Sequence, residues 1–166
     1  MKNIVVFASG TGTNFINIYK KLKLGNINLL ISNNANCGAV VFAKKNNINF
    51  KIINKSRSEN LEKDYENVLE KYNPDLILLA GFLKKIPKKI INLYKNKIMN
   101  VHPSLLPKYG GKGFFGINVH KSVIKSKDKI SGATIHFVDD KYDEGPIVLQ
   151  KKIDVLKNDS AESLSK

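Results

Sequence analysis

The chain has 166 residues, of which 42% are hydrophobic and 25% are charged, and its formal net charge is +14. No run of about 18 apolar residues occurs, which excludes a membrane-spanning helix, and the single cysteine, Cys37, excludes a disulfide within the chain. We therefore expect one cytoplasmic domain, residues 1–166, large enough to enclose a hydrophobic core.

Strand-like and helix-like segments alternate along the chain. Short apolar runs predict strands over residues 4–8, 27–32, 48–53, 76–80, 98–101, 133–138 and 147–153. Apolar residues spaced by three and four predict helices over residues 15–24, 39–45, 58–72 and 119–124, and Pro87 opens a further short helix.

This alternation predicts an α/β fold: a Rossmann-like, mostly parallel sheet with helices on both faces. The short connection between the last two strands predicts a terminal antiparallel hairpin. After Ser160, a plausible N-cap, another helix begins, and the sequence ends at Lys166 after about one and a half turns. We therefore expect a single domain whose C-terminal helix is cut short.

The loop at 9–14, Ser-Gly-Thr-Gly-Thr-Asn, joins the first strand to the first helix. Backbone N–H groups and the helix dipole make such a junction suitable for an anion. The loop matches neither the dinucleotide-binding nor the P-loop pattern. A simpler interpretation is that Thr13 or Asn14 only caps the helix, and capping is compatible with phosphate binding.

Asn100 and His102 stand two residues apart at the end of a strand, and Pro103 follows at once. Because side chains alternate along a strand, the amide and the imidazole share one face. Asp143 lies in an acidic turn between the last two strands. Together these residues could supply an oxyanion donor, a proton shuttle and a carboxylate for acyl transfer. Taken singly, His102 could be a structural histidine and Asp143 a turn residue.

The strong positive charge raises the alternative of a non-catalytic nucleic-acid-binding module. The basic residues are 27 Lys and one Arg, Arg57, whereas base and phosphate recognition favours Arg. The lysines also form no single stripe with interleaved aromatic residues. We therefore expect no nucleic-acid partner. His120 lies in a helical pattern and His136 within a strand, and the spacing of the histidines and the cysteine predicts no metal site.

Five segments together resemble the phosphoribosylglycinamide formyltransferase family. They are Ser-Gly-Thr-Gly-Thr-Asn at 9–14, Leu-Ala-Gly-Phe-Leu at 79–83, Asn-Val-His-Pro-Ser-Leu-Leu-Pro-Lys-Tyr at 100–109, His-Phe-Val at 136–138 and Asp-Glu-Gly-Pro-Ile at 143–147. The resemblance spans nearly the whole chain. It implies a formyltransferase fold, with 10-formyltetrahydrofolate as cosubstrate, glycinamide ribonucleotide as acceptor and no metal.

The resemblance also implies roles for individual residues. Asn100, His102 and Asp143 match the catalytic trio of the family. The residues that match the site for the ribonucleotide phosphate are Gly12, Thr13 and Asn14, and those that match the folate pocket are Phe82, Leu83, Lys84, Lys85, Ile86 and Asn100. Lys84 stands where Arg is expected, Arg57 is a weak candidate for a folate-contacting Arg, and the loop at 110–116 is longer than in some relatives.

Two other folate-dependent activities share this chemistry and are kept as alternatives. Methionyl-tRNA formyltransferase would add a tRNA-binding domain and resembles the chain less at 9–14. Formyltetrahydrofolate hydrolase would use water as acceptor and usually has a preceding regulatory domain. The sequence gives no prediction of oligomeric state.

Overall fold

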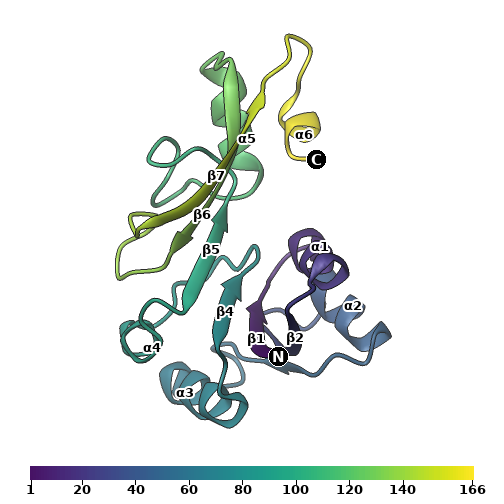
Figure 1. Ribbon diagram of the computed structural model, residues 1–166, viewed down its shortest axis with the longest axis vertical. Helices are drawn as coiled ribbons and strands as arrows, with labels where there is room; N and C mark the ends of the chain where they lie inside the picture. The colour runs from purple at the N-terminus through teal and green to yellow at the C-terminus, as the bar shows by residue number, and fades with distance from the viewer. The chain divides into compact units, whose positions relative to one another are not determined.

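Seven strands and six helices alternate along the chain in the computed structural model, which describes residues 1–166 (Figure 1). The strands are β1 (Lys2–Phe7), β2 (Gly25–Ser32), β3 (Phe50–Ile52), β4 (Leu76–Leu79), β5 (Ile98–His102), β6 (Ile130–Phe137) and β7 (Ile147–Asp154). The helices are α1 (Thr13–Lys21), α2 (Gly38–Lys45), α3 (Leu61–Tyr72), α4 (Lys88–Leu93), α5 (Ile117–Lys125) and α6 (Ala161–Leu164).

The strands form one sheet in the order β3-β2-β1-β4-β5-β6-β7. Strand β1 pairs in parallel with β2 and β4, and β2 pairs in parallel with β3, whereas β6 and β7 are antiparallel. The predicted α/β fold with a mostly parallel sheet and a terminal hairpin is therefore confirmed. The chain divides into two compact units, Met1–Met99 and Asn100–Lys166.

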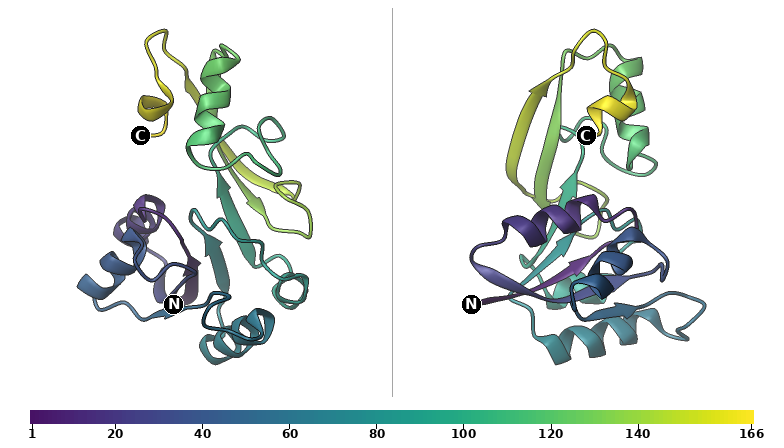
Figure 2. Two further views of the ribbon diagram at one scale, coloured as in Figure 1. Left: turned by 180° about the vertical axis from the view of Figure 1, so that it is seen from behind. Right: turned by 90° about the vertical axis from the view of Figure 1, so that its right-hand side faces the viewer.

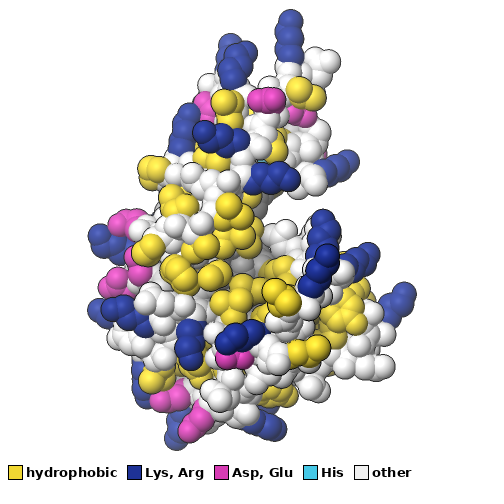
Figure 3. Space-filling model, in the orientation of Figure 1, with side chains coloured by type: hydrophobic (Ala, Val, Ile, Leu, Met, Phe, Trp, Pro, Cys, Tyr) yellow, Lys and Arg dark blue, Asp and Glu magenta, His cyan; other side chains and the backbone are white.

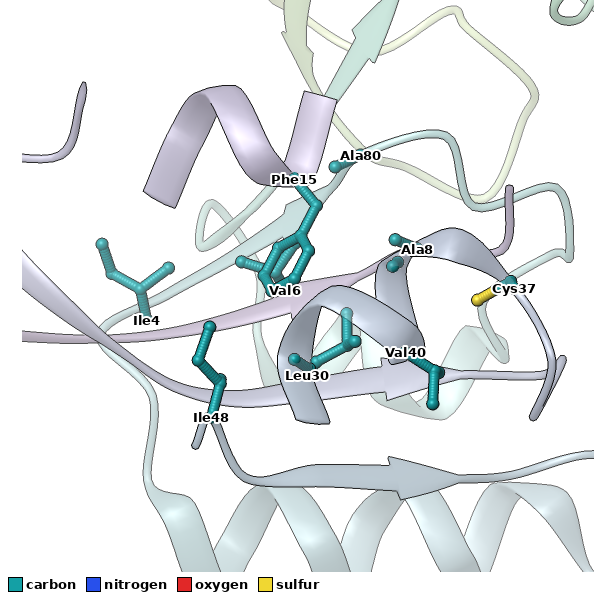
Figure 4. Packing of buried hydrophobic residues seen from close by; sticks show 11 residues of the cluster. Ile4, Val6, Ala8, Phe15, Leu30, Cys37, Val40, Ile48 and Ala80 are labelled. Atoms are coloured by element: carbon teal, nitrogen blue, oxygen red, sulfur yellow. The ribbon is translucent and has the colours of Figure 1, made fainter. Parts of the chain in front are cut away.

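The first unit has helices on both faces of its parallel strands. Helices α1 and α2 lie together on one face, and α3 and α4 lie together on the other (Figures 1 and 2). Figure 4 shows part of its core, where Phe15 of α1 and Val40 of α2 pack with Val6 of β1 and Leu30 of β2. Each of these four side chains is at most 1% exposed. Because β1 and β2 are covered by helices, they read in the sequence as continuous apolar runs.

The second unit contains the β6–β7 hairpin together with helices α5 and α6, which contact each other. The N–H of Phe137 donates to the carbonyl of Pro146 at 2.9 Å and closes the hairpin connection. Helix α6 begins as predicted at Ser160, whose hydroxyl accepts from the Ser163 N–H, while the Ser163 hydroxyl accepts from the Ser160 N–H.

Several predicted element boundaries were wrong, and three of them have a clear local cause. Helix α1 begins at Thr13 with Gly12 as N-cap, and no side chain caps it, so neither Thr13 nor Asn14 is the cap. The same helix ends before Leu22, which turns to an extended conformation, and Gly25 opens β2 instead of closing the helix. Helix α3 begins only at Leu61, because the side chain of Asn60 accepts from the Lys63 N–H and sets the start there.

No helix is long and apolar enough to cross a membrane. On the face shown in Figure 3, the lysine side chains are spread among hydrophobic and uncharged ones rather than gathered into one patch.

Candidate active site

Two side chains of β5 approach the same carboxylate in the second unit. Asn100 and His102 are two residues apart on the strand, and Asp143 lies in the connection between β6 and β7. The Asn100 Nδ2 donates to Asp143 Oδ1 at 3.4 Å, and the His102 Nδ1 lies 3.5 Å from Asp143 Oδ2. The side chains of His102 and Asp143 are only 4% and 12% exposed. The structure thus brings together the three residues that were expected to form the catalytic trio.

His136 of β6 joins this group. Its Nδ1 lies 2.9 Å from the carbonyl oxygen of Phe137, which can only accept, so Nδ1 carries the proton. The Nε2 lies 3.1 Å from Asn100 Nδ2 and 3.5 Å from Asp143 Oδ1, so it accepts from the amide when the ring is neutral and donates toward the carboxylate when the ring is protonated. One amide hydrogen of Asn100 therefore points to His136 and the other to Asp143, which fixes the orientation of the amide.

The ring of His102 is held from the opposite side by the chain that follows β5. Its Nε2 lies 2.7 Å from the carbonyl oxygen of Tyr109, so Nε2 is the donor in this contact. The Nδ1, which faces Asp143, is the nitrogen left for proton exchange. An imidazolium would donate to Tyr109 and Asp143 at once, whereas a neutral ring can satisfy only one of them.

The connection that carries Asp143 is shaped by two backbone requirements. Asp143 itself has a φ of 58°, a region that short polar side chains tolerate better than most. A Cβ at Gly145 would lie 1.8 Å from the carbonyl oxygen of Phe137, so only glycine fits there. Gly145 is therefore a steric requirement of the connection that carries the Asp143 carboxylate.

Several contacts keep the Asp143 carboxylate ionised. Burial by itself would raise the pKa of Asp143, but hydrogen bonding from a protonated His136 and from the Gly111 N–H, together with positive charge on His102, lowers it overall. The Gly111 N–H donates to Asp143 Oδ2 at 2.9 Å. A carboxylate that stays charged while partly buried is suited to holding an imidazolium beside it.

A buried polar network fixes the loop between β5 and the rest of the unit. The hydroxyl of Thr134, on β6, donates to the Ser104 carbonyl at 2.6 Å and accepts from the Leu106 N–H at 3.0 Å. Gln150 of β7 donates to the Leu106 carbonyl and to the Thr134 hydroxyl, at 3.0 and 2.9 Å. The loop after His102 is therefore tied to both strands of the hairpin.

The loop at 9–14 lies in the first unit, beside the N-termini of two helices. Gly12 has a φ of 86°, and a Cβ there would lie 2.8 Å from the backbone N and Cα of Ala39, in the first turn of α2. Neither α1 nor α2 has a side-chain cap or an acidic residue in its first turn. Thr13 and Asn14 are exposed. Free N–H groups of two helices thus meet at the predicted phosphate loop, where they favour negative charge.

The stretch 82–86, also in the first unit, divides between core and surface. Phe82 is buried, with its ring edge against Phe7 at a centroid distance of 5.2 Å, and Ile86 is buried as well. Leu83 is 56% exposed, and Lys84 and Lys85 are exposed. Of the five residues in this stretch that were matched to a folate pocket, Leu83 and the two lysines therefore have side chains at the surface, and the other two support the loop.

The chain contains no cluster of three or more His, Cys, Asp or Glu residues with the geometry of a metal site. A cavity of about 290 Å³ lies in the second unit and includes Tyr109 and Asp128 in its lining. None of the four residues grouped at Asp143 lines it. The candidate site is thus defined by its converging polar groups rather than by this cavity.

His136 is the site residue that sequence reasoning missed. The sequence placed it correctly inside a strand but gave it no partner. A signal was present, because Thr134 and His136 alternate with the apolar Ile135 and Phe137, and both polar side chains are buried at 2% exposure or less. Polar residues at a period of two on the inward face of a strand indicate a buried polar site.

Comparison with known proteins identifies the family of the chain. The family model described as "Formyl transferase" matches residues 2–166. The chain is 40% identical over 173 residues to the chloroplastic phosphoribosylglycinamide formyltransferase of Arabidopsis thaliana, covering 99% of this chain and 59% of that protein. It is 38% identical to the phosphoribosylglycinamide formyltransferase of Haemophilus influenzae, covering 99% of this chain and 78% of that protein.

A solved structure gives the same result for the fold. The crystal structure of the phosphoribosylglycinamide formyltransferase from Anaplasma phagocytophilum superposes with a TM-score of 0.88 at 33% identity, covering 99% of this chain and 78% of the other. The chain spans less than two thirds of the plant relative's length. The relatives described here match nearly the whole length of this chain and are phosphoribosylglycinamide formyltransferases. On the family match and these identities, the chain belongs to the formyl transferase family.

Proposed function

We propose that this chain transfers a formyl group from 10-formyltetrahydrofolate to the amine of glycinamide ribonucleotide, a step of purine biosynthesis. The observation that carries the proposal is the convergence of the Asn100 amide and the His102 imidazole on the carboxylate of Asp143. The names of the relatives, which specify this acceptor, support the choice of substrate.

In the proposed reaction the amine nitrogen attacks the formyl carbon, a new C–N bond forms and the carbonyl electrons move onto oxygen. Asn100 stabilises that oxygen. In the free protein both amide hydrogens are engaged, and the contact to Asp143 is the longer, at 3.4 Å against 3.1 Å to His136. The hydrogen directed at Asp143 is therefore the one released to the oxyanion, a type of contact worth about 3–4 kcal/mol in other enzymes.

The intermediate collapses when the bond from the formyl carbon to the folate nitrogen breaks and the carbonyl reforms. The attacking amine must lose a proton and the folate nitrogen must gain one. His102 carries out this exchange through Nδ1, because Nε2 is held by the Tyr109 carbonyl. Asp143, whose pKa is lowered in the fold, stays ionised and stabilises the imidazolium. The proposal includes neither a covalent intermediate nor a metal.

The two substrates are assigned to separate groups of residues. Gly12, Thr13 and Asn14 bind the ribonucleotide phosphate through backbone N–H groups at the N-termini of α1 and α2. We assign folate binding to the stretch 82–86, where Leu83, Lys84 and Lys85 are exposed and Phe82 and Ile86 are buried. The family motif assigns Asn100 to the folate as well. These assignments rest on the family motifs and on the exposure of the residues.

The partners in this proposal are small molecules, with no nucleic acid and no membrane. The cytoplasmic location expected from the sequence stays a prediction, since the plant relative carries the name "chloroplastic".

The proposal is tested by supplying 10-formyltetrahydrofolate to the purified chain with three acceptors in parallel: glycinamide ribonucleotide, methionyl-tRNA and water. Formation of tetrahydrofolate is followed by absorbance, and His102→Ala serves as the inactive control. We expect turnover with glycinamide ribonucleotide alone. Turnover with tRNA or water instead would assign the chain to one of the two related activities, and no turnover with any acceptor would reject formyl transfer.

A further inference from the structure

One short turn touches both partners of the His102–Asp143 pair. The carbonyl oxygen of Tyr109 accepts from His102 Nε2 at 2.7 Å, and two residues later the Gly111 N–H donates to Asp143 Oδ2 at 2.9 Å. The segment Tyr109–Gly111 thus contacts both groups of the pair, in which His102 Nδ1 lies 3.5 Å from Asp143 Oδ2.

The backbone conformation of the Tyr109–Gly111 turn is unfavourable and needs contacts from outside the turn. Tyr109 has a φ of 57° and Gly111 a φ of 88°, and the left-handed region is costly for a bulky side chain such as that of Tyr109. Within the turn, the Gly110 N–H makes a long bond of 3.3 Å to the Pro107 carbonyl. A strained segment persists only when surrounding contacts fix it.

The side chain of Tyr109 makes a contact outside the turn that can fix its backbone. Its phenol donates to Asp128 Oδ2 at 2.8 Å, and Lys108 Nζ contacts both oxygens of the same carboxylate at 2.7 and 2.8 Å. The Asp128 side chain is 15% exposed. The hydrogen bonds from Lys108 and Tyr109 lower the pKa of Asp128, so the carboxylate is charged at neutral pH. Hydrogen bonds to a charged acceptor are stronger than neutral ones.

We propose that Asp128 and Tyr109 are positioning residues of the active site: Asp128 holds the Tyr109 phenol, and the Tyr109–Gly111 turn in turn sets the His102–Asp143 pair. Asp128 lies outside the catalytic group and touches none of its four members in any hydrogen bond described above. For its effect on turnover the inference rests on the proposed function, but its effect on His102 is independent of any substrate.

The first measurement is made on the free protein by nitrogen-15 NMR, using the proton and nitrogen shifts of the His102 Nε2–H group. Tyr109→Phe removes only the phenol oxygen, and Asp128→Ala removes its acceptor. We expect both variants to shift the His102 signal in the direction of a weaker hydrogen bond. The His136 Nδ1–H group, bonded to the Phe137 carbonyl, serves as internal reference and should stay in place.

The second measurement is turnover. We expect Tyr109→Phe and Asp128→Ala each to lower kcat by roughly threefold to tenfold, with KM for either substrate changed less than about twofold, because the contact acts on the geometry of the pair. The double variant should lose no more than the single ones, since both break one contact. Asp128→Asn, whose amide oxygen can still accept from the phenol, should recover part of the loss. Tyr94→Phe, a half-buried tyrosine at the end of α4, is the matched control.

The outcomes separate this inference from the proposed function. If the parent chain shows no formyl transfer, the proposed function fails, while the NMR shifts still test the positioning role. If Tyr109→Phe is folded by circular dichroism and leaves the His102 signal where Tyr94→Phe leaves it, the positioning role is overturned. Additive losses in the double variant would overturn it as well, because they would mean that phenol and carboxylate act separately.

Discussion

The side chains of Asn100 and Asp143, 43 residues apart in the sequence, are joined by a hydrogen bond of 3.4 Å from Nδ2 to Oδ1. The bond connects β5 with the hairpin connection between β6 and β7, and it uses the hydrogen that Asn100 would give to an oxyanion. The amide is therefore held in its working orientation before substrate arrives, which lowers the cost of reorganisation during the reaction.

The first prediction concerns the two residues of β5. Asn100→Ala and His102→Ala should each lower kcat by about 100-fold or more, since one removes the oxyanion donor and the other the proton carrier. The melting temperature should stay close to that of the parent. Asn92→Ala, on the exposed side of α4, is the control and should behave as the parent. Turnover near the parent level in either β5 variant would remove that residue from the catalytic group.

The second prediction concerns His136. In His136→Phe the Asn100 amide loses the acceptor that directs one of its hydrogens. We expect kcat to fall by roughly tenfold while KM for both substrates changes little, because the residue orients Asn100 and binds no substrate. His136→Gln can still accept from Asn100, so its kcat should lie between those of His136→Phe and the parent. Equal kinetics for His136→Phe and the parent would mean that Asn100 needs no orienting partner.

Much of this architecture can be read from the sequence because its signals are local. Asn100 and His102 share a face through strand alternation alone, and the short acidic connection at Asp143 predicts a hairpin. These features need no knowledge of distant contacts. The same is true of the buried parallel strands, which appear as uninterrupted apolar runs.

What the sequence could not supply depends on contacts across the fold. His136 meets Asn100 only because β6 lies where it does, and no local pattern names that partner. Gly12 is the N-cap of α1 in place of Thr13 or Asn14, and its backbone lies so close to α2 that an added Cβ would be 2.8 Å from the backbone N and Cα of Ala39. The Tyr109–Asp128 bond likewise joins residues whose sequence neighbours give no hint of pairing.

The third prediction concerns the phosphate loop. Asn14→Ala should raise KM for glycinamide ribonucleotide and leave KM for 10-formyltetrahydrofolate unchanged, because it removes an exposed side-chain amide beside the backbone N–H groups, which favour a phosphate over a pteridine. Asn17→Ala, exposed one turn further along α1, is the matched control. Initial rates are measured while each substrate is varied at saturation of the other. An equal rise in both Michaelis constants would contradict a phosphate site.

The fourth prediction concerns stability in acid. The pKa of Asp143 is lower in the folded than in the unfolded chain, so the unfolded state binds the proton first as the pH falls. The carboxylate therefore contributes stability above its ordinary pKa near 3.9, and this contribution is lost as the pH falls through the lower folded value. Asp143→Asn should therefore make the free energy of unfolding depend less on pH over this acidic range, as measured by urea denaturation. A parallel pH profile for parent and variant would mean that the folded and unfolded pKa values of Asp143 are the same.

The last prediction concerns His120, on α5. Its Nδ1 is buried and has no hydrogen-bond partner, and burial lowers the pKa of the ring. The unfolded chain, with a histidine pKa near 6.5, then binds a proton at a pH where the folded chain does not. Folding stability attributable to His120 is thus fully present above about pH 6.5 and falls as the pH drops toward the lower folded pKa.

His120→Leu removes this proton and fills the site with an apolar side chain of similar size. The free energy of unfolding, measured by urea denaturation at pH 7.5 and at pH 5.5 (values of roughly one unit on either side of the ordinary histidine pKa), should fall less for the variant than for the parent. The other two histidines are unchanged in the variant, so the difference between the two slopes isolates His120. If the variant loses as much stability as the parent over this range, the proton reaches His120 equally well in the folded state, and the unpartnered Nδ1 is not protected from solvent.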